Sequence, residues 1–146
     1  EYMKLALKEA KKAGQKAEVP VGAVLVAETG NILSLSHNQA ITLADPTAHA
    51  EILALREAAQ KSLNFRFLST TLYVTIEPCI MCMGAIVHAR VERVVFGAKD
   101  LKWGAAGSLY NFAEDIRLNH QPEITHGVCQ DECRTLIQEF FRSKRM

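Results

Sequence analysis

Residues 71–98 read TLYVTIEPCIMCMGAIVHARVERVVFGA, and the pattern in this stretch decides the expected fold. Thr71 to Ile76 is rich in β-branched and aromatic residues, which predicts a strand. Pro78 ends this strand, because the residue before a proline is disfavoured in the helical region, and a helix is expected from about Cys79 to Ala89. Val91 to Ala98 predicts the next strand. A strand, a helix and a strand in succession are typical of the parallel part of an α/β sheet.

The flanking sequence continues this alternation of strands and helices. Val21 to Ala27 is continuously apolar, as a strand covered on both faces would be, and Ile32 to His37 follows it across a turn with alternating polarity. Asp45 or Thr47 is expected to cap a helix. The other predicted elements are a first helix with a basic face over about 1–12, a helix over about 48–59, a short strand near 123–125 and a last helix over about 131–144. We therefore predict an α/β fold, a three-layer α/β/α sandwich around a mixed five-stranded sheet, with an antiparallel first hairpin and parallel later strands.

The composition is that of an ordinary globular domain. The length of 146 residues predicts one domain, 1–146. The composition, with 49% hydrophobic and 23% charged residues, excludes a disordered or collagen-like chain. The net charge of +1 means that any attraction to nucleic acid has to come from a local basic patch. No apolar run reaches the roughly 20 residues of a membrane helix, and the charged first residues contain no signal-peptide region. We expect a cytoplasmic domain without a membrane partner.

Two short motifs carry the chemistry: His49-Ala50-Glu51 and Pro78-Cys79-Ile80-Met81-Cys82, each at a predicted helix start. Cys79 and Cys82 are three residues apart, so their sulfurs emerge on one side of the first helical turn. A helix start carries partial positive charge, which favours thiolates. Together with His49 they form a Cys₂His set. Three protein ligands leave a tetrahedral zinc ion one open position for water, which distinguishes catalytic from structural sites.

Glu51 is expected to move protons rather than to bind the metal. On a helix, side chains two residues apart diverge by about 200°, so Glu51 and His49 do not face the same ion. At the helix start Glu51 can still lean over a water whose pKa zinc lowers to about 7. We therefore expect one zinc ion per chain, held by His49, Cys79 and Cys82.

Two other interpretations of the cysteines stay open at this point. A Cys-x-x-Cys pair is also a redox motif, although thioredoxin-type motifs lack the upstream His-x-Glu. A closed structural zinc site would need a fourth ligand, for which Cys129, Cys133 and His88 are conceivable donors, but no second paired spacing matches. The presence of both motifs at helix starts favours catalytic zinc.

The pattern H-x-E…P-C-x-x-C is the signature of the zinc-dependent deaminases, and the chain resembles the bacterial tRNA adenosine deaminases along nearly its whole length. The segments that carry the resemblance are EVPVGAV at 18–24, His37-Asn38, DPTAHAE at 45–51, LYVTIEPCIMC at 72–82, RVVFG at 93–97, GAAGSL at 104–109, Asn119-His120 and Phe140-Phe141-Arg142. The zinc motif covers the whole deaminase superfamily, whereas the segments outside it indicate the tRNA-acting branch. Met83 and Trp103 depart from the family, which more often carries smaller residues there, and Trp103 could alter how nucleotides pack near the site.

This resemblance implies a cytidine deaminase-like fold and a hydrolase that converts the wobble adenosine of an arginine tRNA anticodon to inosine. By the match of the motifs, His49, Cys79 and Cys82 bind zinc. Hydroxide attacks C6 of adenine while Glu51 protonates N1 and then helps the amine to leave as ammonia. The resemblance also implies a homodimer, with the RNA touching both subunits.

The same match implies substrate contacts outside the metal site. Asn38 would hydrogen-bond the target nucleotide, and Asp100 and Asn119 would contact the RNA near the site. Phe140 or Phe141 would shape the pocket for a splayed base. Because the two are adjacent they cannot share a helix face, and Phe141 is assigned to the pocket. Basic residues at the end of the last helix are placed to meet phosphates, namely Arg142, Lys144 and Arg145.

Two rival functions are distinguished by what they would need. A free-base or nucleoside deaminase acting on guanine, cytosine or cytidine would share the chemistry, but it would have a closed pocket without a basic approach. The basic last helix argues against it. A non-catalytic, zinc-stabilised RNA-binding module would need neither Glu51 nor an open position on the metal.

Overall fold

The computed structural model describes residues 1–144, and their strands form one five-stranded sheet with helices on both faces. Arg145, the last of the basic residues expected to meet phosphates, lies outside the described residues. The elements in chain order are α1 (Tyr2–Gln15), β1 (Gly22–Val26), β2 (Ile32–His37), α2 (Ala50–Ser62), β3 (Thr71–Ile76), α3 (Ile80–Ala89), β4 (Arg93–Ala98), β5 (Glu123–His126) and α4 (Gln130–Lys144).

The sheet is mixed, as the sequence predicts. Its strand order is β2-β1-β3-β4-β5. β1 pairs antiparallel with both β2 and β3, whereas β3, β4 and β5 run parallel. Helix α3 is the crossover between the parallel neighbours β3 and β4. The antiparallel first hairpin and the parallel later strands are thus confirmed.

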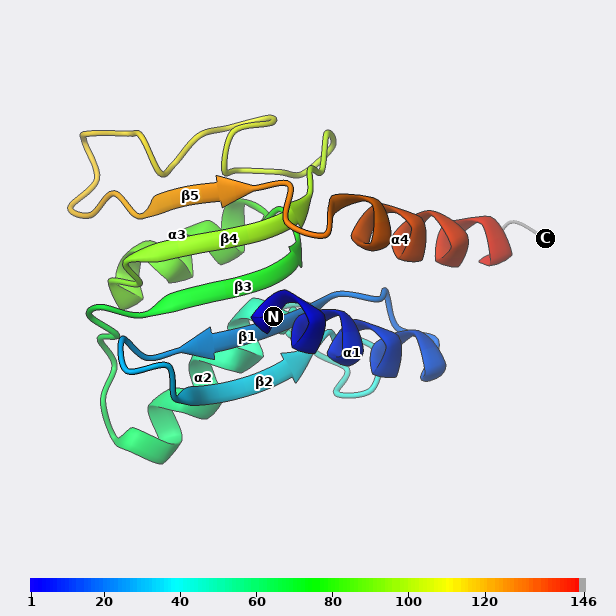
Figure 1. Ribbon diagram of the computed structural model, residues 1–146, viewed down its shortest axis with the longest axis horizontal. Coiled ribbons are helices and arrows are strands. Elements are labelled where there is room, and N and C mark those ends of the chain that lie inside the picture. Colours follow the sequence, from blue (N-terminus) through cyan, green and yellow to red (C-terminus); the bar gives the residue numbers. More distant parts are fainter. Residues whose placement is uncertain (145–146) are drawn as a thin grey trace.

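The predicted three layers are also confirmed. Helices α1 and α4 cover the face of the sheet that is turned toward the viewer in Figure 1, and α2 and α3 cover the other face. The apolar run of β1 is explained by the burial of both its faces. Ala23 and Leu25 belong to the core under α2 and α3, while Val24 and Val26 belong to the core under α1. A strand that is covered on both sides has no position left for a polar side chain.

Both helices behind the sheet begin at a residue of the zinc motif. The N-cap of α2 is His49 and the N-cap of α3 is Cys79. The expected cap by Asp45 or Thr47 is wrong. Asp45 Oδ1 accepts hydrogen bonds from the backbone N–H of Thr47 at 2.9 Å and from Thr47 Oγ1 at 2.7 Å. These bonds close a local turn before the helix, so the helix starts later and at the metal donor itself.

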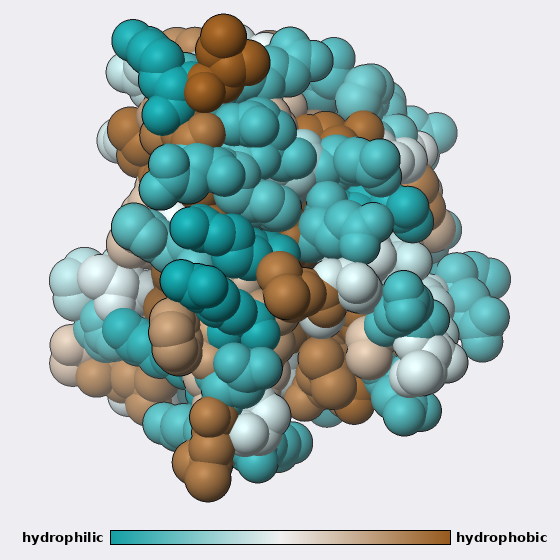
Figure 2. Space-filling model, turned by 90° about the vertical axis from the view of Figure 1, so that its left-hand side faces the viewer, coloured by the Kyte–Doolittle hydropathy of each residue, from teal (hydrophilic) through white to brown (hydrophobic). Residues whose placement is uncertain are grey.

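The two ends of the sheet differ in character. Figure 2 views the end at which β3 and β4 begin, and this surface is mostly hydrophilic, with hydrophobic side chains in separate groups. At the other end, α4 projects past the edge at which β3 ends (Figure 1), and Cys133 is the buried residue of this helix. No helix within residues 1–144 has the length and apolar character needed to cross a membrane.

Candidate functional site

The donor atoms of His49, Cys79 and Cys82 converge between the starts of α2 and α3. His49 Nδ1 lies 3.6 Å from the sulfur of Cys79 and 3.6 Å from that of Cys82. A nitrogen and a sulfur bound to one tetrahedral zinc ion at usual bond lengths are about 3.5 Å apart. The three side chains therefore fit zinc without rearrangement. In the part of the chain that the structure describes, no other group of three such side chains converges, and neither Cys129, Cys133 nor His88 joins this one.

The helix starts make these sulfurs good metal ligands. The hydrogen bond from the Cys82 thiol, together with the His49 ring, lowers the pKa of Cys79 to about 4. Cys82 is the donor in that pair and is buried, which raises its pKa. Because zinc binds the thiolate, loading the site releases the proton that Cys82 retains.

Glu51 lies in the first turn of α2 and is only 4% exposed. Its burial raises the pKa of the carboxyl to about 7, and the nearby Cys79 sulfur adds to this shift. The carboxyl does not belong to the converging donor group. Such a carboxyl can take up and return a proton near neutral pH, which is the property that a proton shuttle requires.

A buried glutamate holds the loop that leads into His49. Glu18 is 1% exposed, and its carboxylate accepts hydrogen bonds from the backbone N–H groups of Ile41 at 3.1 Å and Thr42 at 2.6 Å and from Thr42 Oγ1 at 2.7 Å. Burial by itself raises the pKa of Glu18, but these hydrogen bonds outweigh it and keep the pKa below 4.5. One wall of the site is therefore fixed through backbone groups.

A second buried glutamate holds the loop on the other side of the donors. Glu77 directly precedes Pro78 and is 3% exposed. Its carboxylate accepts hydrogen bonds from the backbone N–H groups of Asp100, Ala106 and Ser108 at 3.0–3.1 Å, and from the Ser108 hydroxyl. The sequence motifs indicate no role for Glu18 or Glu77. The signal that could have found them is an acidic residue beside an apolar, proline-containing segment, VPV or PC.

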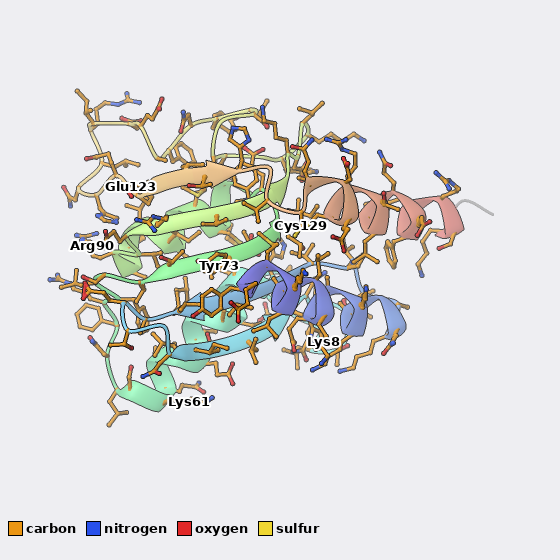
Figure 3. The ribbon with its side chains drawn as sticks, in the orientation of Figure 1. Lys8, Lys61, Tyr73, Arg90, Glu123 and Cys129 are labelled. Carbon is orange, nitrogen blue, oxygen red and sulfur yellow. The ribbon has the colours of Figure 1, made fainter. Side chains whose placement is uncertain are left out.

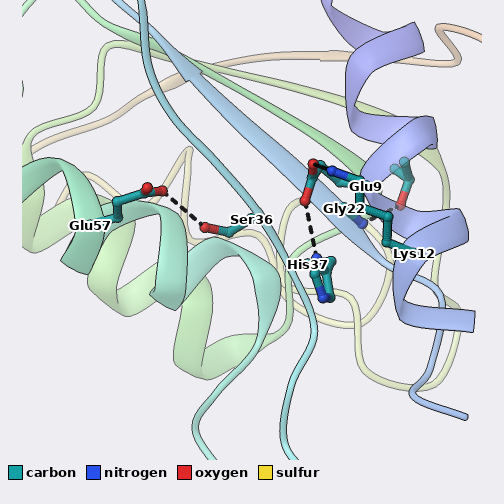
Figure 4. A network of polar contacts seen from close by, with 7 residues as sticks. Glu9, Lys12, Gly22, Ser36, His37 and Glu57 are labelled. Carbon is teal, nitrogen blue, oxygen red and sulfur yellow. Dashed lines mark hydrogen bonds and ion pairs between the residues drawn. The ribbon is translucent and has the colours of Figure 1, made fainter. Parts of the chain in front are cut away.

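A further polar network joins α1 to the end of β2, next to Asn38 (Figure 4). His37 Nδ1 lies 3.0 Å from Glu9 Oε1, and Lys12 Nζ donates to Glu9 Oε2 at 2.9 Å. Burial tends to raise the pKa of Glu9, but the bonds to His37 and Lys12 outweigh it and lower the pKa below 4.5. The ionised Glu9 carboxylate thus ties the end of β2, which Asn38 follows, to helix α1.

Of the proposed substrate contacts, Asn38 and Asp100 lie on the two walls of the site. The Asn38 amide makes only two long hydrogen bonds, both of 3.4 Å, to Val19 O and from Ala40 N. Asp100 Oδ1 instead accepts the backbone N–H groups of Lys102 and Trp103 at 3.1 Å. The amide of Asn38, which is 8% exposed, is therefore weakly held, whereas one oxygen of Asp100 already shapes its own loop.

Asn119 is not brought near the donors. It is exposed, and the next residue, His120, has Nε2 2.6 Å from Val91 O, just before β4. Figure 3 shows Arg90 and Glu123 at the same end, where β4 and β5 begin. The six residues of β4 separate this end from the donors by about 20 Å.

Phe141 lies on the projecting part of α4 and is 45% exposed. Its ring meets that of Phe140 edge-on at 5.4 Å between centroids. The adjacent ring is half-buried rather than part of the core. Both aromatic rings therefore lie on a helix that reaches past the end of the sheet at which the donors sit.

The comparison of this sequence with known proteins agrees with the geometry of the three donors. The family described as cytidine and deoxycytidylate deaminase zinc-binding region matches residues 1–98. The chain is 50% identical over 143 residues to a tRNA-specific adenosine deaminase of Haemophilus influenzae, with 98% of this chain and 83% of that protein covered. It is also 50% identical over 144 residues to the tRNA-specific adenosine deaminase of Bacillus subtilis, which covers 99% of this chain and 89% of the relative.

Solved structures agree with this result. A structure from studies of A-to-I editing by tRNA:A34 deaminases at the wobble position superposes with a TM-score of 0.89 at 41% identity, covering 92% of this chain and 97% of that one. A guanine deaminase from Nitrosomonas europaea gives a TM-score of 0.82 at 22% identity, covering 94% of this chain and 81% of the other. The second likeness shows the fold alone. The predicted cytidine deaminase-like architecture is thus confirmed.

Proposed function

The chain belongs to the cytidine and deoxycytidylate deaminase family, and we propose that it hydrolyses the wobble adenosine of a tRNA anticodon to inosine. The single observation that carries this proposal is the set of three converging donors with a buried glutamate beside them, within a chain that matches tRNA-specific adenosine deaminases over 98% of its length. The reaction consumes one water and releases one ammonia. Residues 1–146 act as one deaminase domain.

The chemistry divides between the metal and Glu51. His49, Cys79 and Cys82 would hold the zinc ion, which would lower the pKa of a water molecule to about 7 and so make hydroxide available at neutral pH. Glu51 takes the proton of that water and delivers it to N1 of adenine, which makes C6 more electrophilic. After oxygen has bonded to C6, Glu51 carries the remaining proton of the new C6 hydroxyl to the amino group. The C6–N bond then breaks with ammonia as the leaving group, and the C6 oxygen becomes the carbonyl of inosine. A carboxyl with a pKa of about 7 suits both transfers.

The remaining polar residues hold the RNA. Asn38, with its weakly held amide, hydrogen-bonds the target nucleotide, and Asp100 contacts the neighbouring RNA with its second carboxylate oxygen. Phe141 on the projecting end of α4 packs against a splayed base. Asn119 lies about 20 Å from the donors, so its contact with the RNA remains a prediction that rests on the family resemblance.

We further propose a homodimer that acts in the cytoplasm on an arginine tRNA. Large hydrophobic side chains are exposed at the metal end of the molecule, and a second copy would cover them. They are Ile41, Leu43 and Ile80, which are 71%, 51% and 48% exposed. Several large apolar side chains exposed at one end of a molecule are the kind of surface that a partner covers. The tRNA assignment follows from the family resemblance.

The proposal is tested by supplying the zinc-loaded protein with anticodon stem-loops that carry a wobble adenosine and, separately, with free adenosine, cytidine and guanine. We expect inosine from the stem-loop and little product from the free compounds. The matched control is the same adenosine placed in a perfect duplex, which should react far more slowly because unstacking costs a few kcal/mol. Deamination of a free base or nucleoside as fast as of the stem-loop would contradict the tRNA assignment and support the rival nucleoside deaminase.

A further inference from the structure

Trp103 is the single tryptophan of the chain, and it is 65% exposed at the metal end of the molecule. It lies one residue before Gly104, which pairs with Cys79 in an isolated antiparallel bridge. The adjacent Ala105 donates its backbone N–H to Pro78 O at 2.9 Å. The backbone that carries the indole is therefore joined directly to the backbone of a zinc ligand.

The segment around Trp103 is fixed by several hydrogen bonds. The Trp103 N–H donates to Asp100 Oδ1 at 3.1 Å, and the Gly104 N–H donates to Asp100 O at 2.9 Å. The Glu77 carboxylate holds this segment on both sides, through the backbone N–H groups of Asp100 and Ala106. The loop packs so closely here that a Cβ at position 104 would overlap the Glu77 carboxyl group. The position of the Trp103 backbone relative to Cys79 is thus set before any ligand binds.

An exposed aromatic side chain on a fixed backbone beside an RNA site has a specific use. Proteins recognise unpaired nucleotides by stacking splayed bases on aromatic rings, and stacking tolerates any base because every base has a π face. An aromatic side chain on a fixed backbone has only its own rotation to lose when the base arrives, which keeps the entropic cost of stacking low. The neighbouring Leu101 is even more exposed, at 79%, but has no aromatic face.

We propose that Trp103 is a stacking platform for a nucleotide next to the target adenosine. This inference rests on the proposed function, since it takes a single-stranded RNA loop as the ligand. The ring adds affinity for the loop without contact to the reacting atoms, so it acts on binding and not on the chemical step. Glu77 and Asp100 are the positioning residues that present it.

The single tryptophan makes the proposal directly observable. A zinc-loaded Glu51→Gln variant binds the wobble-adenosine stem-loop without turning it over, and its tryptophan fluorescence is recorded as the stem-loop is added. With excitation at wavelengths that tyrosine does not absorb, we expect quenching that saturates with binding, because the tryptophan emission comes from position 103 alone. The stacking base is located with stem-loops that each carry an abasic site at one nucleotide flanking the target. Quenching of Trp103 should be reduced for the stem-loop that lacks the base that stacks. Unchanged fluorescence at saturating RNA would overturn the proposal.

Three substitutions separate stacking from bulk. Trp103→Phe keeps an aromatic face and should bind the stem-loop within about threefold of the parent, whereas Trp103→Leu and Trp103→Ala should lose about tenfold or more. The loss should appear in KM, with kcat unchanged. The matched control is Leu101→Ala, which removes a still more exposed apolar side chain two residues away and should leave binding unaltered. Parental affinity in Trp103→Leu would contradict stacking.

Failure of this inference differs from failure of the proposed function. If the parent converts the stem-loop to inosine and Trp103→Ala matches it in KM, the stacking platform is wrong and the deaminase assignment stands. If the parent neither binds nor converts the stem-loop, both are wrong. Zinc content of one ion per chain in each variant shows that the fold and the donors are intact.

Discussion

The Glu51 carboxyl illustrates how burial, helped by the nearby Cys79 sulfur, prepares a residue for chemistry. An exposed carboxyl would be ionised at neutral pH and could only accept a proton, but at a pKa of about 7 it exchanges protons in both directions. The same residue is excluded from the metal by its place on the helix, two residues after His49. Its contribution can therefore be removed without removing the metal.

Glu51→Gln is expected to keep one zinc ion per chain and to lose at least 10²–10⁴-fold in the rate of inosine formation, because the amide cannot shuttle protons. Metal analysis and a single-turnover assay on the stem-loop check this. Cys79→Ser serves as the contrast, since it should lose zinc as well as activity. A rate in Glu51→Gln within tenfold of the parent would contradict the role of the glutamate.

Glu77 lies two residues before the donor Cys79 and acts on the site through the loop that it holds. In Glu77→Gln an amide NH₂ would face a backbone N–H, so a buried donor loses its acceptor and the free energy of unfolding should fall by about 1–3 kcal/mol. The freed loop should raise KM for the stem-loop more than it lowers kcat. Urea unfolding and steady-state kinetics measure the two effects. Ser108→Ala removes one of the four hydrogen bonds and should show a smaller change of the same kind; an equal or larger one would contradict the carboxylate as the main anchor.

At the scale of helices and strands, the local patterns predicted most of what is observed. The apolar run of β1 and the strand–helix–strand stretch at 71–98 were informative because burial on both faces and proline act on neighbouring residues. The helix cap at Asp45 was wrong, since Thr47 competes for the same carboxylate. The metal donors were predictable because each motif is only a few residues long.

Long-range contacts explain what the sequence could not predict. Glu18 and Glu77 bind backbone groups of loops more than 20 residues away, and a backbone N–H leaves no trace in the sequence. Likewise, no pattern indicates that the loop after β4 returns to the far end of the sheet, where His120 meets Val91 O and keeps Asn119 away from the donors.

Helix α2 ends in a strained residue. Its C-cap, Leu63, has φ 56° and ψ 36° in the left-handed region and is 92% exposed. Leu63→Gly removes a strain of about 1–2 kcal/mol against an entropic cost of about 0.5–1 kcal/mol in the unfolded chain. The melting temperature of the zinc-loaded protein should therefore rise by about 2–4 °C. Leu63→Ala keeps the left-handed strain and should give no such rise. An equal rise in melting temperature in both variants would show that loss of the exposed leucine side chain, and not relief of backbone strain, causes it.

For the molecule as a whole, two buried carboxylates make the fold sensitive to acid. Glu9 joins α1 to β2, and Glu18 joins the start of β1 to the loop before α2. In both, the folded-state pKa lies below 4.5. Their stabilising contribution is fully present above the unfolded value of about 4.5 and is lost as the pH falls through the lower folded value.

Glu18→Gln should therefore be less stable than the parent at neutral pH, and the difference should shrink as the pH falls below about 4.5. Urea unfolding at a series of pH values measures the free energy of both proteins. Zinc release in acid affects parent and variant alike, so it cancels in the difference. If the difference in free energy of unfolding between parent and variant stayed constant down to the pH of acid unfolding, ionised Glu18 would not be the anchor.

The anchoring of both loops through backbone N–H groups bears on how such a protein can diverge. Glu18 and Glu77 recognise the course of the chain and not the side chains along it. Residues on the outer surface of these loops, Trp103 among them, are thus free to mutate while the donors and Glu51 keep their places. Substrate preference can then change through substitutions on the surface of these loops, while every intermediate sequence keeps its zinc donors and Glu51.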